Sequence, residues 1–127
     1  MTTITDLMTR HPIFLDPEAR IEEAWKIMHD QRVRHVPVCK GSKLVGLVTQ
    51  KDLLVNAQSS ALLTLPVAEV MVFNVKTITE ETDITSAAQM MVNEKISCLP
   101  VVNGDELTGI LTESDFLNLL INLLQRE

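Results

Sequence analysis

Two threonine–aspartate pairs are the residues of this chain best suited to bind a ligand. Thr49 and Asp52 recur as Thr112 and Asp115, at an offset of 63 positions. Each pair stands where an apolar run gives way to a predicted helix, and unpaired N–H groups at a helix start attract phosphate. A threonine hydroxyl there can donate to a phosphate or sugar oxygen, and an aspartate can accept both hydroxyls of a ribose. The spacing therefore indicates two candidate nucleoside sites.

The same spacing also fits a helix capping box, in which the acidic residue only satisfies a free backbone N–H group. Three features favour ligand binding over a simple cap. Both pairs end a predicted buried strand, and both keep Asp where a cap would accept Glu. Gly46 and Gly109 stand three residues before the threonines, and a missing side chain lets another group approach the backbone closely.

The two pairs belong to a repeat that runs through most of the chain without a gap. Met8 corresponds to Met71, for example, and Pro37 to Pro100. A repeat of this length predicts two copies of one supersecondary unit that bury each other's apolar faces. We expect an α/β fold of two tandem βαββα units related by a pseudo-two-fold axis. The predicted boundaries are 1–58 for the first unit, 59–66 for a linker and 67–127 for the second.

Local patterns predict the elements of each unit. Asp16 and Thr79 are expected to cap the first helix of their repeats, with Pro17 at the first helical position. An apolar stripe on each first helix and two strands joined by a glycine turn then precede the Thr–Asp pair. The predicted stripes are Ile21, Ala24, Trp25 and Met28, and Ile84, Ala87, Ala88 and Met91. The predicted strands are 13–15, 35–38 and 44–48 in the first repeat, and 99–102 and 107–111 in the second.

Composition narrows the classes of function. The chain has 127 residues, a net charge of −6, 3% aromatic residues and no tyrosine. It therefore lacks the basic surface and the stacking platforms that nucleic acid requires, and we expect no nucleic-acid partner. The given residues show neither the pattern of a signal peptide nor an apolar run long enough for a membrane span, and Cys39 and Cys98 lack metal-ligand spacing. We expect a cytoplasmic protein with free thiols, no membrane contact and no metal site.

The sequence also offers no catalytic group. The three histidines, His11, His29 and His35, do not converge in the sequence. No serine or cysteine has a plausible base and orienting partner. We expect no enzymatic activity and no catalytic cofactor.

The last predicted helix is apolar on nearly every side. Its apolar residues are Phe116, Leu117, Leu119, Leu120, Ile121, Leu123 and Leu124. One interpretation is an ordinary core helix that runs slightly long. The other is burial against a second chain, because a helix apolar all round needs more cover than one small domain supplies. We favour the second interpretation and expect a homodimer or another protein partner.

These marks together resemble the CBS domain pair, also called a Bateman module. The resemblance runs from about Asp6 to Leu117 and rests on the paired Gly-h-h-Thr-x-x-Asp endings (h apolar), the h-Pro-Val second strands and the helix stripes. It implies a stand-alone pair of CBS domains that binds AMP, ADP or ATP in two clefts between the halves and catalyses nothing. Such modules sometimes bind S-adenosylmethionine or a cyclic dinucleotide, and they commonly dimerise through their helices.

The resemblance also assigns roles to residues. It implies that Asp52 and Asp115 hold ribose, with Thr49 and Thr112 near ribose or phosphate. The adenine contacts that it implies are Val36, Pro37, Val75 and Lys76 in the first cleft, and Leu99, Pro100, Pro12 and Ile13 in the second. The phosphate contacts that it implies are Arg34, His35, Lys51 and Ser114.

The two predicted clefts differ in charge. The first is surrounded by Arg34, His35, Lys51 and Lys76. In the second, Ser97 and Cys98 fill the zone of Arg34 and His35, and Glu113 stands beside the threonine. We expect the first cleft to prefer polyphosphate, and the second to bind more weakly, to take a less anionic ligand or to stay empty. The leading prediction is a sensor of adenosine nucleotides that signals to a partner or through its dimer. The alternative is an interaction or assembly protein whose clefts are vestigial or bind S-adenosylmethionine or a cyclic dinucleotide.

Overall fold

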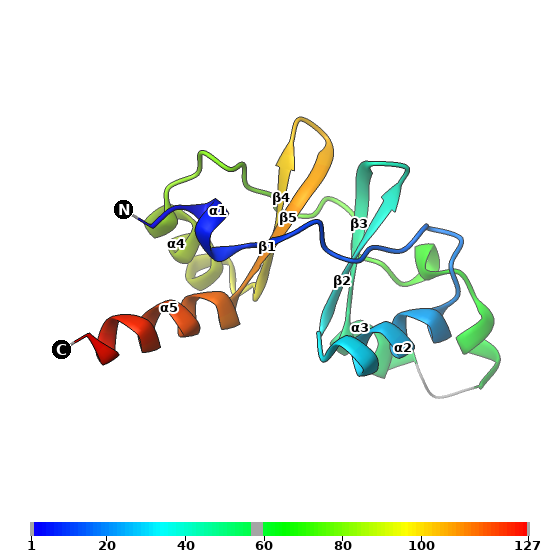
Figure 1. Ribbon diagram of the computed structural model, residues 1–127. Coiled ribbons are helices and arrows are strands. Elements are labelled where there is room, and N and C mark those ends of the chain that lie inside the picture. The colour runs from blue at the N-terminus through cyan, green and yellow to red at the C-terminus, as the bar shows by residue number, and fades with distance from the viewer. Residues whose placement is uncertain (1, 57–59, 127) are drawn as a thin grey trace. The chain divides into compact units, whose positions relative to one another are not determined.

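The computed structural model describes residues 2–56 and 60–126 (Figure 1). It divides the chain into two compact units that do not coincide with the two halves of the sequence. The central unit is Ile13–Val75, and the terminal unit combines Met1–Pro12 with Lys76–Glu127. The N-terminal segment therefore packs with the second repeat. Residue 59 of the predicted linker lies outside the described residues.

The central unit is an antiparallel hairpin packed against helices (Figure 1). Its elements are α2 (Ile21–Gln31), β2 (His35–Lys40), β3 (Lys43–Thr49), α3 (Gln50–Asn56) and the 3-10 helices η1 (Ser60–Thr64) and η2 (Val67–Glu69). Gly41, at the turn between β2 and β3, has a φ of 64°, a left-handed conformation that glycine adopts without strain. Single bridges extend the hairpin on both sides, Leu15 parallel to Val38 and Val72 antiparallel to Leu47.

The terminal unit repeats this plan. Its elements are α1 (Ile4–Leu7), β1 (Thr9–Arg10), α4 (Ile84–Glu94), β4 (Cys98–Asn103), β5 (Glu106–Thr112) and α5 (Glu113–Gln125). β4 and β5 form the antiparallel hairpin, β1 pairs antiparallel with β5, and Ile78 makes a parallel bridge with Val101. Two repeats of one α/β plan are thus confirmed.

Each unit has its own apolar core, formed by the stripe of its first helix and its buried strands. The central core consists of Leu15, Ile21, Ala24, Met28, Val36, Val38, Val48, Leu53 and Val67. The terminal core consists of Ile4, Met8, Ile78, Ala87, Met91, Leu99, Val101 and Leu111. Trp25 and Ile84 are half-buried and pack against these cores. The predicted helix stripes and third strands are therefore confirmed.

The strand predicted over 13–15 is wrong, because only Leu15 makes a bridge. The Leu15 N–H donates to the Pro37 carbonyl and the Cys39 N–H donates to the Leu15 carbonyl, both at 2.9 Å. The next bond along this parallel ladder would need an N–H from Pro37, which proline lacks. The ladder therefore stops at Leu15, and Ile13 and Phe14 lie exposed outside it.

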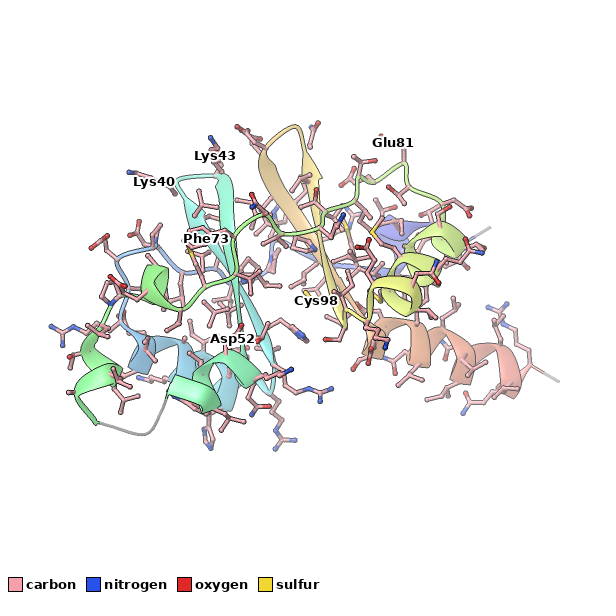
Figure 2. All side chains as sticks on the ribbon, turned by 180° about the vertical axis from the view of Figure 1, so that it is seen from behind. Lys40, Lys43, Asp52, Phe73, Glu81 and Cys98 are labelled. Carbon is pink, nitrogen blue, oxygen red and sulfur yellow. The ribbon has the colours of Figure 1, made fainter. Side chains whose placement is uncertain are left out.

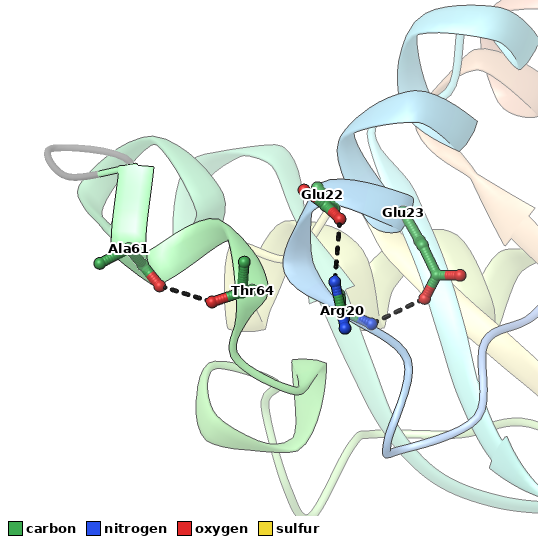
Figure 3. Close-up of polar contacts among 5 residues, drawn as sticks. All are labelled: Arg20, Glu22, Glu23, Ala61 and Thr64. Atoms are coloured by element: carbon green, nitrogen blue, oxygen red, sulfur yellow. Dashed lines mark hydrogen bonds and ion pairs between the residues drawn. The ribbon is translucent and has the colours of Figure 1, made fainter.

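The predicted start of the first helix is also wrong. α2 begins at Ile21, and the Asp16 Oδ1 atom instead accepts the Glu18 N–H (2.9 Å) in a turn. The helix is capped at Arg20, whose backbone N–H donates to Glu23 Oε2 (2.7 Å; Figure 3). The local side-chain bond of Asp16 competes with helix initiation, so the chain reaches α2 only after this turn.

The second repeat departs from the prediction in the same way. α4 begins at Ile84, and its cap is Asp83, whose Oδ2 atom accepts the Ser86 N–H (3.3 Å). Thr79 donates its backbone N–H to Thr82 Oγ1 (3.1 Å) and does not cap the helix. In both repeats, therefore, the helix starts later than the sequence pattern predicts.

α5 packs against the terminal core through Phe116 and leaves most of its other apolar residues exposed. No residue of α5 is buried in the described chain. Leu117, Leu120, Ile121 and Leu124 leave between 50% and 58% of their surface exposed. In the part of the chain that the structure describes, no helix has the length and apolarity to cross a membrane.

Gly46 and Gly109 make room for two methionines of the chain itself. A Cβ atom on Gly46 would lie 2.6 Å from Met71 Sδ and 3.0 Å from the Val72 carbonyl oxygen. A Cβ atom on Gly109 would lie 2.5 Å from Met8 Sδ and 3.0 Å from the backbone carbonyl oxygen of Thr9. The group that approaches each glycine backbone is thus an intramolecular thioether, so these glycines do not favour a ligand over a cap.

We expect Gly46→Ala to lower the free energy of unfolding by about 1–3 kcal/mol, because the methyl group overpacks against the Met71 sulfur. Chemical denaturation of Gly46→Ala, Met71→Ala and the double variant measures the contact. The double variant should be more stable than the sum of the single losses by about 0.5 kcal/mol or more. Additive losses would contradict the contact.

Candidate functional site

In the central unit the predicted ribose aspartate is held by its threonine. Thr49 ends β3, and Asp52 lies in the first turn of α3 (Figure 2). The Thr49 hydroxyl donates to Asp52 Oδ2 (2.7 Å), and the Asp52 N–H donates to the Thr49 hydroxyl oxygen (3.2 Å). Both residues are half-buried. The carboxylate is therefore oriented by the end of a buried strand while part of it remains accessible.

The terminal unit has the same pair with a different bond pattern. The Thr112 backbone N–H and hydroxyl both donate to Asp115 Oδ2, at 2.8 and 3.3 Å. Together with the Asp115 N–H, these groups form a capping box. Burial raises the pKa of the Asp115 carboxyl group, and the two bonds from Thr112 oppose this shift. The capping geometry is therefore real here, and it occupies one carboxylate oxygen.

The cross-strand neighbour of each threonine differs between the units. His35 lies directly opposite Thr49 in the β2–β3 ladder. Cys98, which is labelled in Figure 2, lies opposite Thr112 in the β4–β5 ladder. Side chains directly opposite in an antiparallel pair have Cβ atoms about 5 Å apart. The structure thus brings an imidazole to the central Thr–Asp pair and a thiol to the terminal one.

Backbone hydrogen bonds hold the residues that directly precede β2 and β4. The Arg34 carbonyl accepts the Gln50 N–H (2.8 Å), and the Ser97 carbonyl accepts the Glu113 N–H (3.1 Å). Each bond ties the start of the second strand to the first residue of the closing helix. Arg34 is therefore held beside the central Thr–Asp pair, and its side chain is exposed.

The residues around the two Thr–Asp pairs differ in charge on the same backbone. In the central unit, Arg34, His35 and the exposed Lys51 lie near the pair. The equivalent positions in the terminal unit are Ser97, Cys98 and Ser114, and Glu113 begins α5. The central site therefore favours an anion more strongly than the terminal site does.

Burial keeps both thiols protonated. It raises the pKa of Cys98 to about 12, with a further contribution from the nearby Asp115 carboxylate, and it raises the pKa of Cys39 to about 11. A thiol with such a pKa is neither a nucleophile nor a metal ligand at neutral pH. Among the described residues, no three His, Cys, Asp or Glu side chains gather where they could hold a metal ion.

The predicted adenine residues are divided between cores and surface. The side chains of Val36 and Leu99 belong to the two cores, so only their backbones could meet a base. Pro37 and Pro100 are fully buried as well. The remaining predicted contacts are more accessible: Val75 and Pro12 are half-buried, and Lys76 and Ile13 are exposed.

Lys76 already has a protein partner. Its ammonium group pairs with the Glu94 carboxylate of α4 at 3.6 Å. Both side chains are largely exposed, so water screens this pair and a ligand phosphate can compete for the lysine. The sequence pattern gave no signal for Glu94, which lies 18 positions away.

An open cavity of about 290 Å³ in the terminal unit reaches Asp115. It lies between α1 and α5, and its polar lining includes Asp6, Asn118, Asn122 and Arg126. A small polar group can therefore approach the Asp115 carboxylate from within this unit. The apolar periodicity of α5 gives no signal for this cavity, because most of the α5 residues that line it are polar.

Comparison with known proteins identifies the repeat. The family model described as CBS domain matches residues 4–58 and 67–122, which is most of the chain. The CBS domain-containing protein YhcV of Bacillus subtilis is 30% identical over 129 residues, covering 100% of this chain and 89% of the relative. Homoserine O-acetyltransferase of Methanohalobium evestigatum is 34% identical over 121 residues, but these cover 94% of this chain and only 24% of the enzyme. The chain therefore spans about a quarter of that enzyme's length, and the enzyme name describes a much longer protein.

Solved structures share the whole fold. The crystal structure of AcuB from Vibrio cholerae, a protein assigned to acetoin utilization, matches with 39% identity and a TM-score of 0.90, covering 98% of this chain and 94% of that one. The CBS domain pair of protein MJ0100, solved in complex with 5′-methylthioadenosine and S-adenosyl-L-methionine, matches with 30% identity and a TM-score of 0.84. That match covers 94% of this chain and 99% of the MJ0100 chain.

Proposed function

Because the chain belongs to the CBS domain family and carries two copies of that domain, we propose that it is a regulatory module that binds adenosine nucleotides at its two Thr–Asp pairs. The observation that carries this proposal is the carboxylate held in the first turn of each closing helix by the threonine that ends a buried strand. The MJ0100 pair, a relative of nearly the same extent, was solved with two adenosine derivatives, which supports an adenosine-type ligand here.

The roles proposed for the aspartates and threonines follow from side-chain chemistry, whereas the buried Val36 and Leu99 can meet a base only through their backbones. Asp52 and Asp115 accept the ribose hydroxyls, and Thr49 and Thr112 orient them. Hydrogen bonds to a charged acceptor contribute about 1.5–3 kcal/mol each, which is enough for a carboxylate to select ribose. The base contacts comprise Val36, Pro37, Val75 and Lys76 for the Asp52 site, and Leu99, Pro100, Pro12 and Ile13 for the Asp115 site.

Charge determines which nucleotide each site prefers. Arg34, His35 and Lys51 suit the phosphates of ADP or ATP at the central site. The terminal site has Ser114 as its polar neighbour and a half-buried carboxylate. Extra phosphate charge is unfavourable there, so we assign AMP or a less anionic ligand to this site.

A specific observation favours S-adenosylmethionine as a second candidate at the terminal site. The side chains at positions 97 and 98 are uncharged, and the MJ0100 relative was solved with S-adenosyl-L-methionine. A sulfonium ligand gains from the acidic Glu113 and Asp115, whereas a triphosphate does not. In this version the module senses the supply of an adenosyl compound.

Ligand binding can affect another protein chain only through a contact surface of this module. The exposed apolar face of α5 is such a surface. Leu117, Leu120, Ile121 and Leu124 form an exposed i, i+3, i+4, i+7 face. The first repeat has Leu54, Ala57, Gln58 and Ala61 at the equivalent sequence positions, so this apolar pattern is not shared by the two repeats. The α5 pattern is symmetric about residues 120 and 121, so two copies can pair antiparallel about a two-fold axis.

We therefore propose that the module is a homodimer. Ligand binding shifts the population of its conformations, and a partner protein binds one of these conformations preferentially. The two buried free thiols suit a reducing cytoplasm. No catalytic step is part of this proposal.

Adenosine nucleotides should raise the melting temperature of the protein. A ligand at 100 times its dissociation constant adds about 2.7 kcal/mol to the free energy of unfolding, which a thermal-shift assay detects. AMP, ADP, ATP, S-adenosylmethionine and a cyclic dinucleotide are compared on the wild type, Asp52→Ala and Asp115→Ala. The ATP-induced shift should disappear in Asp52→Ala and persist in Asp115→Ala.

Asp105→Ala, in the turn between β4 and β5, is the control for loss of an acidic residue and should keep every ligand response. No shift of the wild type with any ligand would favour the alternative, an assembly protein with vestigial sites. Tighter ATP binding by Asp52→Ala than by Asp115→Ala would contradict the order of the two sites.

Leu120→Glu should weaken the dimer about 30-fold or more, because a buried apolar anchor contributes about 2 kcal/mol or more and a charge takes its place. Analytical ultracentrifugation over a dilution series measures this change. Leu54→Glu, an exposed leucine on α3, is the matched control and should leave the dimer intact. A wild-type protein that sediments as a monomer at every accessible concentration would refute the α5 interface.

A further inference from the structure

We propose that Met8 and Met71 are positioning residues for the two candidate nucleotide sites. Each thioether fills the space that a glycine leaves on the strand that leads to the ribose aspartate. It thereby fixes the chain segment that carries a predicted adenine contact. This inference rests on the proposed function, and it assigns a role to side chains that touch no ligand.

The contact in the central unit lies just before the Thr–Asp pair. Met71 Sδ would be 2.6 Å from a Cβ atom on Gly46, so the sulfur lies against the bare backbone of β3. The following residue, Val72, exchanges two hydrogen bonds with Leu47, at 2.8 and 3.1 Å. The segment is therefore fastened to β3 by packing and by backbone bonds, two or three residues before Thr49.

The fastened segment then turns toward its predicted adenine contact. Asn74 has a φ of 50°, a left-handed conformation that is uncommon for a residue with a side chain. Val75 follows directly. Only two residues separate Val72 from Val75, so the position of Val75 relative to Asp52 is set at the Met71 contact.

The terminal unit repeats this arrangement at the same offset. Met8 is buried, and its Sδ would be 2.5 Å from a Cβ atom on Gly109 of β5. The next residues form β1, which pairs with β5, and the His11 N–H donates to the Thr108 carbonyl (3.2 Å). His11 has a φ of 47° and precedes Pro12, a predicted adenine contact.

Methionine suits this role for a physical reason. Its unbranched side chain can lie flat on a glycine backbone, and its thioether is soft and polarizable. Leucine has a similar volume, so exchange in a core costs less than about 1.5 kcal/mol. Leucine is branched and shorter, however, so it cannot reach and cover the same backbone. A Met→Leu substitution therefore tests whether the thioether positions the adenine-contact segment, with little change in the free energy of unfolding.

The test measures AMP affinity at one site at a time by isothermal titration calorimetry. Asp115→Ala leaves the central site, and Asp52→Ala leaves the terminal site. In the Asp115→Ala background, Met71→Leu should weaken AMP binding about tenfold, because a less preorganised site must be ordered on binding. In the Asp52→Ala background, the same substitution should change the affinity by less than about twofold.

Met8→Leu should produce the reverse pattern and provides a second variant. Met90→Leu is the matched control. This methionine packs against the terminal core, and the closest neighbours of Gly46 and Gly109 do not include its side chain. It should leave both affinities unchanged. Denaturation of each ligand-free variant establishes that the fold is retained.

Two failures are distinguishable. If AMP and the other adenosine compounds do not bind the wild type at all, the proposed function fails, and the positioning role fails with it. If the wild type binds AMP but Met71→Leu leaves the central affinity unchanged, or weakens both sites equally, the positioning role alone is refuted.

Discussion

Each candidate site depends on the contact between a threonine that ends a buried strand and an aspartate one turn into the next helix. The strand is immobilised by its hairpin partner and by the apolar core, so the threonine has little freedom. The Thr49–Asp52 and Thr112–Asp115 bonds pass this rigidity to a carboxylate that is only half-buried. A rigid and accessible carboxylate can bind a diol with little loss of entropy. Met71 and Met8 pack on glycines of the same strands, and His35 and Cys98 lie opposite the two threonines.

The two repeats share a backbone and differ in charge. His35 and Cys98 occupy the same ladder position opposite their threonines, yet one is an imidazole and the other is a buried thiol whose pKa is raised. Asp115 also serves its own helix through a capping box, and burial raises its pKa. Asp52, like Asp115, accepts the hydroxyl of its own threonine. We therefore propose that the Asp52 site takes the more anionic ligand and the Asp115 site the less anionic one.

The sequence predicted the parts of the fold that follow from periodicity. The stripes of α2 and α4, the buried third strands and the glycine turns recur at a fixed offset, and each has a strong local pattern. The helix starts were mispredicted, because Asp16 and Thr79 take part in turns that a single sequence cannot distinguish from caps. The strand at 13–15 failed for a tertiary reason, since Pro37 lacks the N–H group that would extend the ladder.

The candidate sites were predicted in part. The Thr–Asp contacts follow from spacing along one chain segment. Gly46 and Gly109 were correctly identified as places of close approach, but their partners are Met71 and Met8, which belong to other segments. The Lys76–Glu94 pair likewise joins residues from different elements. Such contacts depend on how segments pack, and no local pattern encodes them.

The most direct test of the central claim compares AMP with 2′-deoxy-AMP and 3′-deoxy-AMP in calorimetric titrations of each isolated site. The account predicts that loss of either hydroxyl weakens binding about tenfold, because each bonds to a charged carboxylate. It also predicts that any residual binding after replacement of both aspartates by alanine no longer distinguishes the three compounds. Equal affinity of the intact sites for all three would contradict the account.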